Sequence, residues 1–356
     1  MSRTKGKSVP PQAGFSSRVI AWQRVHGRHD LPWQQTRDPY RIWLSEVMLQ
    51  QTQVGTVIPY YTRFLERFPD AASLGAADID DVLALWSGLG YYSRGRNLHA
   101  AAVRVAREFG GRFPTDRVTL ESLPGVGRST AAAIAAFSVS AREAILDGNV
   151  KRVLARHFAI EGFPGVSSVE KRMWVLAESL LPAEDVEAYT QGVMDLGATL
   201  CTRSRPRCGA CPVAGSCEAH ASGREAEFPS ARPRKPLPLK TTVMLVLVRS
   251  GRMLLRRRPS TGIWGGLWSF PEFDTAQAAR DYARRQGGRL RDETELSPVP
   301  HGFSHYRLTI HPLRCVAGDG AVTADEPGLR WMTRDEALAS SLPAPVRAIA
   351  GDVPLD

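Results

Sequence analysis

A proline-rich, basic segment at residues 223–240, GREAEFPSARPRKPLPLK, constrains the fold most, because the hydrophobic periodicity of the chain changes across it. From Phe15 to about Ala221, apolar residues recur at spacings of three and four, which is the pattern of amphipathic helices. Beyond the segment, TTVMLVLVRSGRMLLRRR indicates two strands around a tight turn, YRLTIHPLRCV indicates another strand, and residues 275–286 have the pattern of a helix. The sequence therefore predicts an all-α part followed by a smaller α+β part.

This change of period divides the 356 residues into four predicted segments. The chain length and a hydrophobic content of 43% suffice for a core in each of the two folded parts. We predict a multi-domain protein with a disordered basic tail at residues 1–14, a helical domain at 15–222, a linker at 223–240 and an α+β domain at 241–350.

The charge balance favours a polyanionic partner. Lys and Arg total 46 against 36 acidic residues, a formal net charge of +10 that is spread along the chain. Such a surplus favours binding to phosphates, since neutralising them releases counterions, although many basic proteins bind no nucleic acid. No apolar run is long enough to cross a bilayer, and the first residues lack the apolar stretch of a secretory signal. We therefore expect a cytoplasmic protein that does not associate with membranes.

Four of the five cysteines lie close together, with the spacing Cys201-x6-Cys208-x2-Cys211-x5-Cys217, and no histidine lies among them. In a reducing compartment such a group indicates metal binding rather than disulfides. Four thiolates on one short loop can hold zinc tetrahedrally or the irons of a cubane cluster. The spacing by itself leaves both possibilities open.

The string LESLPGVGRSTAAAIAAF joins two helical patterns through Gly125 and Gly127. Glycines at a helix start let backbone N–H groups approach a phosphate closely, although the same string could be an ordinary connection between helices. We expect Ser129 or Thr130 to cap the second helix. Asp147, in ILDGNVKRVLAR, precedes a further helical pattern and could likewise serve only as its cap.

Glu46 lies in the segment LPWQQTRDPYRIWLSEVMLQQTQVGTVIPYY, where its neighbours at helical spacing are largely apolar. Removal from water disfavours a carboxylate, so the pKa of Glu46 should rise from ~4.3 toward neutrality, as a general acid requires. A partly exposed glutamate in a salt bridge is the alternative interpretation. Gln50 and Gln51 are expected to continue the same helix.

Together these motifs resemble the adenine DNA glycosylases of the helix-hairpin-helix, iron-sulfur DNA glycosylase superfamily. The cysteine spacing resembles the 4Fe-4S loop of that superfamily, LPGVGRSTA resembles its hairpin, and SEVMLQQTQV resembles the adenine-specific members in particular. The resemblance implies a structural 4Fe-4S cluster on the four clustered cysteines, Glu46 as the catalytic acid, and Asp147 as the residue facing the sugar of the excised nucleotide. It also implies that Asn149 and Lys151 support catalysis.

The resemblance further implies which residues contact DNA. An enzyme that acts on a stacked base must extrude the base and fill the gap. Tyr91, in GLGYYSRGRNL, matches the residue that wedges into the duplex, although a tyrosine pair at this place could also be core packing. The remaining expected contacts are Gln50, Gln51, Gly125, Gly127 and Ser129 for the DNA, and Trp33 and Gln191 for the adenine.

After the linker, RRRPSTGIWGGLWSFPEF resembles the Nudix-like domain that follows the catalytic domain of adenine DNA glycosylases. A Nudix hydrolase holds Mg²⁺ on the carboxylates of an REUxEE helix, and the corresponding stretch, TAQAARDYARRQGG, lacks that group, so we expect no pyrophosphatase activity. In HGFSHYRLTI, Phe303, Ser304 and His305 match the loop that recognises 8-oxoguanine. A plain turn before an edge strand is the alternative interpretation of this loop.

We therefore expect a base-excision repair enzyme that hydrolyses the N-glycosidic bond of adenine mispaired with 8-oxoguanine or guanine in duplex DNA. Ser129 replaces the nucleophilic lysine of lyase relatives, so the enzyme should be monofunctional. Its partner would be double-stranded DNA of the nucleoid, and we expect a monomer. Water or a transient Asp147 adduct could complete the reaction.

Two rival functions stay open. An endonuclease-III-like lyase that acts on oxidised pyrimidines is disfavoured by Ser129 and by the second domain. A non-catalytic iron-sulfur module that binds DNA would keep the hairpin and the cysteines but would not need Glu46 together with Asp147.

Overall fold

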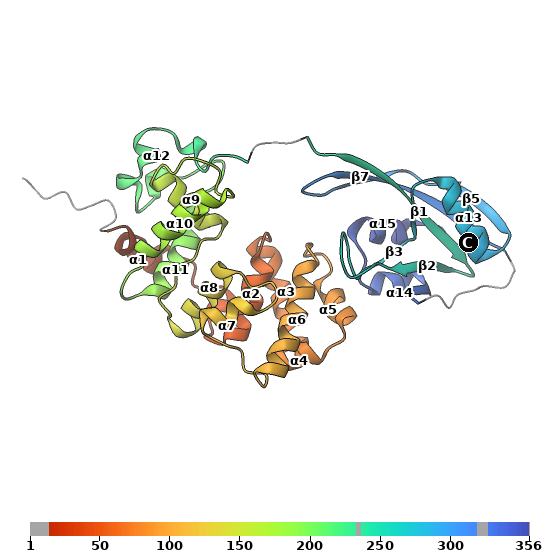
Figure 1. Ribbon diagram of the computed structural model, residues 1–356, viewed down its shortest axis with the longest axis horizontal. Coiled ribbons are helices and arrows are strands. Elements are labelled where there is room, and N and C mark those ends of the chain that lie inside the picture. The colour runs from red at the N-terminus through yellow and green to blue at the C-terminus, as the bar shows by residue number, and fades with distance from the viewer. Residues whose placement is uncertain (1–13, 233–235, 319–326, 356) are drawn as a thin grey trace, which may run out of the picture. The chain divides into compact units, whose positions relative to one another are not determined.

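The chain folds into two compact units in the computed structural model, which describes residues 14–232, 236–318 and 327–355 (Figure 1). The first unit comprises residues 1–76 and 97–233, and the second comprises residues 77–96 and 234–356. The predicted basic tail, residues 1–14, lies outside the described residues apart from Gly14. Among the described residues, no helix is both long enough and apolar enough to cross a membrane.

The first unit is built from helices, as predicted, and residues 14–232 contain no strand. Its α-helices are α1 (Phe15–His26), α2 (Pro39–Leu49), α3 (Val54–Arg67), α4 (Ala71–Ala76), α6 (Ser93–Glu108), α7 (Arg117–Ser122), α8 (Arg128–Val139), α9 (Gly148–His157), α10 (Ser167–Ser179), α11 (Val186–Asp195) and α12 (Glu218–Ala221). Helix α6 begins in the second unit and continues into the first. A π-helical turn, Leu196–Leu200, extends α11 up to Cys201.

Helix α8 lies at the centre of the first unit and packs against α2, α7 and α11. Residues 131–136 of this helix are all buried, and five of these six residues are alanines. Small side chains on every face let several neighbouring helices approach the same helix closely. The alanine-rich sequence that follows the hairpin therefore specifies a central helix.

Two expectations about helix ends are wrong. Helix α2 ends at Leu49, and Gln51 has a positive φ of 58°, because the chain must turn here to enter α3. Gly127 holds the N-cap position of α8 without any side-chain cap, so neither Ser129 nor Thr130 caps that helix. The Ser129 hydroxyl instead accepts a hydrogen bond from the backbone N–H of Leu146 at 2.9 Å.

The second unit is a mixed sheet with helices on both faces, in agreement with the predicted α+β domain. Its described strands are β1 (Leu239–Arg249), β2 (Arg252–Arg257), β3 (Trp268–Ser269), β4 (Glu272–Phe273), β5 (Leu290–Glu295), β6 (Val299–Gly302), β7 (Arg307–Ala317) and β8 (Leu329–Met332). The strand order is β3-β2-β1-β7-β5, with β4 on β1, β6 on β7 and β8 on β2. Strands β1 and β7 pair in parallel, from Leu239 with Arg307 to Val248 with Val316, and the other pairs are antiparallel.

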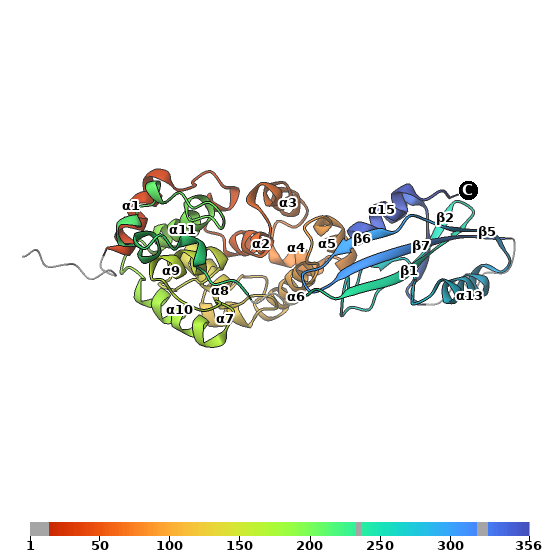
Figure 2. The same ribbon diagram turned by 90° about the horizontal axis from the view of Figure 1, so that it is seen from above.

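Successive residues of β1 alternate between two separate cores, because side chains along a strand point to opposite faces. Met244 and Val246 face α14 (Arg334–Ala339) and α15 (Ala344–Asp352), whereas Leu245 and Leu247 face α13 (Ala276–Gly287). Figure 2 shows α15 and α13 on opposite sides of the sheet. The continuous apolar run of β1 therefore reflects burial on both faces.

Part of the segment that we predicted to be a linker belongs to the core of the first unit. Phe228 is only 3% exposed and lies in the same hydrophobic cluster as residues of α9 and α11. The buried guanidinium of Arg156 donates hydrogen bonds to the backbone carbonyls of Glu225 and Phe228, both at 2.9 Å. The sequence did not indicate this buried residue, because Phe228 is a single aromatic residue among many polar residues and prolines.

Residues 77–96, which we had assigned to the helical domain, belong to the second unit. This segment contains α5 (Ile79–Trp86) and Tyr91. Asp80 forms an ion pair with Arg257 at 2.5 Å, and the Tyr92 hydroxyl donates to the carbonyl of Leu342 at 3.2 Å. These partners lie far away in the sequence, so the helical periodicity of the segment could not reveal them.

We predict that Phe228→Ala lowers the free energy of unfolding of the first unit by about 3–5 kcal/mol, as for other buried phenylalanines. Leu237→Ala is the matched control, because Leu237 lies in the same predicted linker but is 41% exposed. Denaturant unfolding followed by tryptophan fluorescence measures both variants. Equal, small effects of the two substitutions would show that the whole segment is a linker after all.

Candidate active site

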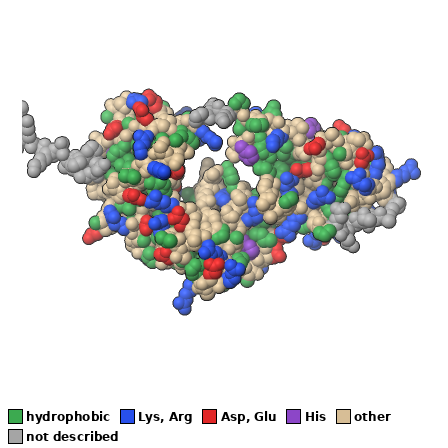
Figure 3. Space-filling view, viewed as in Figure 1, with side chains coloured by type: hydrophobic (Ala, Val, Ile, Leu, Met, Phe, Trp, Pro, Cys, Tyr) green, Lys and Arg blue, Asp and Glu red, His purple; other side chains and the backbone are tan. Residues whose placement is uncertain are grey.

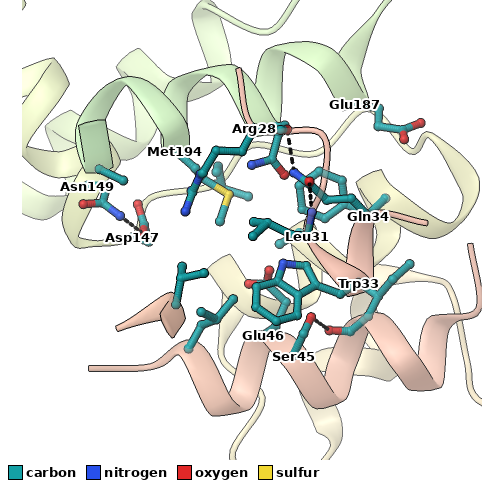
Figure 4. A pocket seen from close by; sticks show the side chains of 18 of the residues that line it. Arg28, Leu31, Trp33, Gln34, Ser45, Glu46, Asp147, Asn149, Glu187 and Met194 are labelled. Atoms are coloured by element: carbon teal, nitrogen blue, oxygen red, sulfur yellow. Dashed lines mark hydrogen bonds between the residues drawn. The ribbon is translucent and has the colours of Figure 1, made fainter. Parts of the chain in front are cut away.

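A cleft of about 1880 Å³ opens in the first unit, between the loop before α2, the end of α2, the start of α8, the start of α9 and helix α11. Figure 4 shows side chains from these elements directed into the same space. Eight of the predicted site residues line the cleft: Trp33, Glu46, Gln50, Gln51, Ser129, Asp147, Asn149 and Gln191.

Glu46 projects into the cleft from the last turn of α2. The helix starts where the Asp38 carboxylate accepts the backbone N–H of Tyr40, and it is buried through Trp43, Val47 and other apolar residues. Trp33 lines the same cleft (Figure 4). Burial, with a smaller contribution from the charge of Asp147, raises the pKa of Glu46 to about 8. Glu46 can therefore carry a proton at neutral pH.

Asp147 lies at the N-cap of α9, on the other side of the cleft. Its carboxylate accepts hydrogen bonds from the backbone N–H of Val150 at 2.8 Å and from the side-chain amide of Asn149 at 3.4 Å. Burial raises the pKa of Asp147, and these two hydrogen bonds oppose that rise because they stabilise the carboxylate. The capping role and a role in the site are therefore compatible.

An arginine and an aspartate that the sequence analysis missed hold one wall of the cleft in place. Asp195 is fully buried at the end of α11 and accepts hydrogen bonds from both the backbone N–H and Nε of Arg28, at 2.8 and 2.7 Å. Gln191 donates to the same carboxylate at 2.8 Å, and Gln34 donates to the Arg28 carbonyl at 3.0 Å. The loop that carries Trp33 is thereby tied to α11. Arg28 and Asp195 are 167 positions apart, so no local motif connects them.

The four clustered cysteines line one small cavity between α9 and the loop that follows α11. Cys201, Cys211 and Cys217 pack against the hydrophobic core of the unit, and no disulfide links them. Burial raises the pKa of the Cys211 thiol to about 11, so in the metal-free chain this thiol is protonated, whereas iron requires a thiolate. Four thiols that line one small, partly buried cavity fit an iron-sulfur cluster.

Two arginines of α9 connect the cysteine loop to the cleft. Arg156 donates to the backbone carbonyls of Thr202 and Arg203, at 2.7 and 3.0 Å. Arg152 donates to the Cys201 carbonyl at 2.7 Å and to the Asn149 side chain at 2.8 Å. Since Asn149 in turn contacts Asp147, a continuous set of hydrogen bonds runs from the first cysteine to the carboxylate in the cleft. Arg152 and Arg156 are four residues apart and shortly follow Asp147, so they lie on one side of the same helix. This spacing was a signal of the link that sequence analysis could have used.

The hairpin residues differ in what their backbone requires. Gly125 has a φ of 76°, and a Cβ there would lie 2.7 Å from the Cβ of Asn97, so glycine is required. Gly127 has open space around it, as expected where a backbone is to approach a ligand closely.

Lys151 does not line the cleft. Its ammonium pairs with Glu170 at 2.5 Å, while its backbone N–H donates to the Asp147 carbonyl at 2.9 Å in the first turn of α9.

The remaining predicted site residues lie in the second unit. Tyr91 is 52% exposed and adopts a positive φ of 46°, an unfavourable conformation for an aromatic residue. The guanidinium of Arg94 lies over its ring, 5.7 Å from the centroid. Phe303, Ser304 and His305 form the tip of the hairpin between β6 and β7, where the backbone N–H of Phe303 donates to the Tyr306 carbonyl at 2.9 Å.

Three family models match the chain in separate segments. Residues 44–179 match the HhH-GPD superfamily of base excision DNA repair proteins, residues 201–217 match the iron-sulfur binding domain of endonuclease III, and residues 242–351 match the NUDIX domain. The second match selects iron-sulfur over zinc for the cysteine loop, so the cofactor is a 4Fe-4S cluster.

Similar proteins cover nearly the whole chain. An adenine DNA glycosylase of Buchnera aphidicola subsp. Baizongia pistaciae is 34% identical over 94% of this chain and 95% of its own length. The adenine DNA glycosylase of Homo sapiens is 34% identical over 98% of this chain and 76% of its own length. Among solved structures, a thermostable thymine-DNA glycosylase aligns with a TM-score of 0.54 and 28% identity over 60% of this chain and 97% of its own.

The raised pKa of Glu46 gives a direct prediction for the free protein. We expect its carboxyl to titrate near pH 8 in ¹³C NMR, with Glu46→Gln identifying the signal. Asp147→Asn should lower the midpoint without restoring 4.5, because it removes only the smaller of the two causes. The folded chain holds this proton more tightly than the unfolded chain, so the stability it contributes is lost as the pH rises from about 4.5 through about 8. A midpoint near 4.5 in the wild type would show that Glu46 is solvated.

Proposed function

Because the chain belongs to the family of adenine DNA glycosylases, we propose that it hydrolyses the bond between adenine and deoxyribose where the adenine is mispaired with 8-oxoguanine or guanine in duplex DNA. Its membership makes it a monofunctional base-excision repair enzyme. The observation that carries the proposal is the pair formed by a protonated Glu46 and a hydrogen-bonded Asp147 in one cleft.

In the proposed mechanism, the Glu46 carboxyl donates its proton to a ring nitrogen of the flipped adenine. Protonation makes the base a better leaving group, so the electron pair of the glycosidic bond departs with the base and leaves an oxocarbenium-like sugar. Water then adds to the sugar carbon, directly or after a transient Asp147 adduct, and releases a proton, which completes the hydrolysis. A carboxyl that stays protonated at cellular pH supports this role, since an ionised glutamate has no proton to give.

Asp147 is proposed to stabilise the positive charge that develops on the sugar. Its hydrogen bonds from Val150 and Asn149 favour the carboxylate and fix its direction before the reaction begins. Arg152 donates a hydrogen bond to the side-chain oxygen of Asn149 and thereby orients its amide, which supports the predicted role of Asn149 in catalysis. The ion pair between Lys151 and Glu170 favours a structural or DNA-facing role for Lys151 over a direct role in the chemistry.

Ser129 explains in chemical terms why the reaction stops at base removal. A lyase needs an amine that forms a Schiff base with the sugar, and a serine hydroxyl cannot form one. Here the hydroxyl holds the backbone at Leu146, directly before Asp147. The rival lyase function is therefore disfavoured, as is a non-catalytic DNA-binding module, which would have no use for the proton on Glu46.

The predicted contacts to DNA remain part of the proposal. Trp33 and Gln191 line the cleft and are proposed to contact the flipped adenine. Gly125, Gly127 and Ser129 at the hairpin are proposed to approach a phosphate. Gln50, Gln51 and Tyr91 are proposed to wedge into the duplex, and the positive φ of both Gln51 and Tyr91 supports a functional reason for holding these side chains outward.

The 4Fe-4S cluster, when bound, supplies a rigid anchor for residues 201–217 and takes no part in the proposed proton transfer. The protein is proposed to act as a monomer on nucleoid DNA. Recognition of 8-oxoguanine is proposed for Phe303, Ser304 and His305, because these residues form the tip of a hairpin on which the polar side chains of Ser304 and His305 are exposed.

Glu46→Gln tests the acid. The amide keeps the size and hydrogen bonding of the side chain but has no proton to donate, so single-turnover excision should fall by ~10²- to 10⁴-fold. Binding to the A:8-oxoguanine duplex, measured at several salt concentrations, should barely change, because phosphate contacts dominate affinity. Glu66→Gln, on the exposed face of α3, is a matched change of charge and should leave both quantities as in the wild type. Near-normal excision by Glu46→Gln would remove Glu46 from the mechanism.

Ser304→Ala and His305→Ala test the recognition of the oxidised guanine. Each should lower the ratio of excision rates on A:8-oxoguanine and A:G by roughly 2- to 13-fold, the loss expected for one hydrogen bond of about 0.5–1.5 kcal/mol. The rate on A:G itself should hardly change. His311→Ala is the control, because His311 is exposed on the adjacent strand β7 but lies away from the hairpin tip. An unchanged ratio in both tip variants would assign recognition elsewhere.

A further inference from the structure

A cluster of aromatic rings surrounds Phe303 at the base of the hairpin between β6 and β7. The centroid of the Phe303 ring lies 5.2 Å from that of Trp264, 4.6 Å from that of His301 and 4.6 Å from that of Tyr306. Trp264 and His301 also contact each other, with centroids 5.3 Å apart. Histidine side chains reach the surface at this end of the sheet (Figure 3).

The Phe303 ring thus contacts three rings, those of Trp264, His301 and Tyr306, that are outside the predicted recognition loop. His301 meets the ring edge to face, with an interplanar angle of 78°. Burial lowers the pKa of His301, so at neutral pH its imidazole packs as an uncharged ring. The geometry is that of favourable aromatic pairs, which prefer edge or tilted arrangements at 4.5–7 Å.

Trp264 has an unfavourable backbone conformation. Its φ is +54°, a region that bulky residues rarely adopt, and it lies between Gly262 and Gly266, which also have positive φ. The loop is fixed by Arg258, which donates to the Ile263 carbonyl at 2.9 Å and whose guanidinium lies 5.7 Å from the Trp264 ring centroid. Backbone strain of this kind persists where the surroundings enforce it, and such sites are often functional.

We propose that Trp264 and His301 are positioning residues, which hold the Phe303 ring and thereby set the conformation of the loop that distinguishes 8-oxoguanine from guanine. The inference rests on the proposed role of Phe303, Ser304 and His305. The carbonyl of Tyr306 already closes the hairpin from one side through the Phe303 N–H. With the ring held as well, Ser304 and His305 at the exposed tip retain few ways to reorient.

The test uses the full-length protein with its cluster and compares variants that remove a ring with variants that keep one. Single-turnover excision is measured at several enzyme concentrations on A:8-oxoguanine and A:G duplexes, which separates the rate at saturation from the half-saturating concentration. Trp264→Leu and His301→Leu should each lower the preference for A:8-oxoguanine by roughly 2- to 13-fold, the loss of one aromatic pair, and leave the A:G rate unchanged. Trp264→Phe and His301→Phe should restore most of the preference.

Phe273→Leu is the matched control. Phe273 contacts the Tyr282 ring at 5.2 Å and packs in the other core of the same sheet, on the side of α13. It should lower the thermal stability of the second unit without changing the preference. An equal loss of preference in Phe273→Leu would mean that any destabilisation of the unit has this effect, and the inference would be wrong.

The remaining outcomes separate the inference from the proposed function. If the wild type excises adenine equally from both duplexes, the proposed preference fails and the inference fails with it. If the wild type has the preference and Trp264→Leu and His301→Leu keep it, only the inference is overturned. Should the leucine variants unfold, His301→Gln and His301→Phe decide the question, because both suit a half-buried position but only one retains a ring.

Discussion

The close contact between the start of α9 and the π-helical turn Leu196–Leu200 is the constraint on which the helical unit depends. A Cβ at Gly197 would lie 2.6 Å from the Cβ of Asn149, so the two backbones can meet only because Gly197 has no side chain. Asp147 is the N-cap of α9, and Cys201, the first cysteine of the cluster loop, directly follows the π-helical turn, so the contact fixes both near each other. Arg152 then links them by hydrogen bonds to Asn149 and to the Cys201 carbonyl. The position of the Asp147 carboxylate in the cleft and the position of the cysteine loop therefore depend on the same contact between the two backbones.

The two carboxyl groups of the cleft differ in their environment in a way that suits different roles. Glu46 lies in the last turn of α2, where the helix dipole disfavours a negative charge, and Asp147 lies at the N-cap of α9, where the dipole favours one. A helix end contributes about 0.3–1 kcal/mol, less than one pKa unit. Burial, which accounts for most of the rise of the Glu46 pKa from 4.5 to about 8, is the larger effect. The dipoles separate the two pKa values, but it is the exclusion of water that keeps Glu46 protonated.

The sequence predicted best what depends on local chemistry. The change of period across the linker predicted the two architectures, and the Asp147-Gly148 turn predicted a helix start that the structure contains. Interactions between distant residues were missed, as in the Arg28–Asp195 pair and the anchoring of Phe228 by Arg156. The predicted end of α2 was also wrong, because Gln50 and Gln51 have ordinary helix propensities. Only the path of the chain into α3 forces the turn. Local patterns thus indicated the candidate acid and carboxylate, while the residues that hold them emerged from the fold.

The second unit joins two segments that sequence analysis had placed in different domains. Arg96, which follows Tyr91 by five residues, donates a hydrogen bond to the carbonyl of Gly265 at 2.5 Å, and Gly265 is the neighbour of Trp264. Tyr91 and Trp264 are both aromatic residues with positive φ, at 46° and 54°. The segment proposed to wedge into the duplex and the loop proposed to support recognition of 8-oxoguanine therefore share a direct contact within one unit. This hydrogen bond joins residues 169 positions apart, so no local pattern of the sequence could place the two segments in one unit.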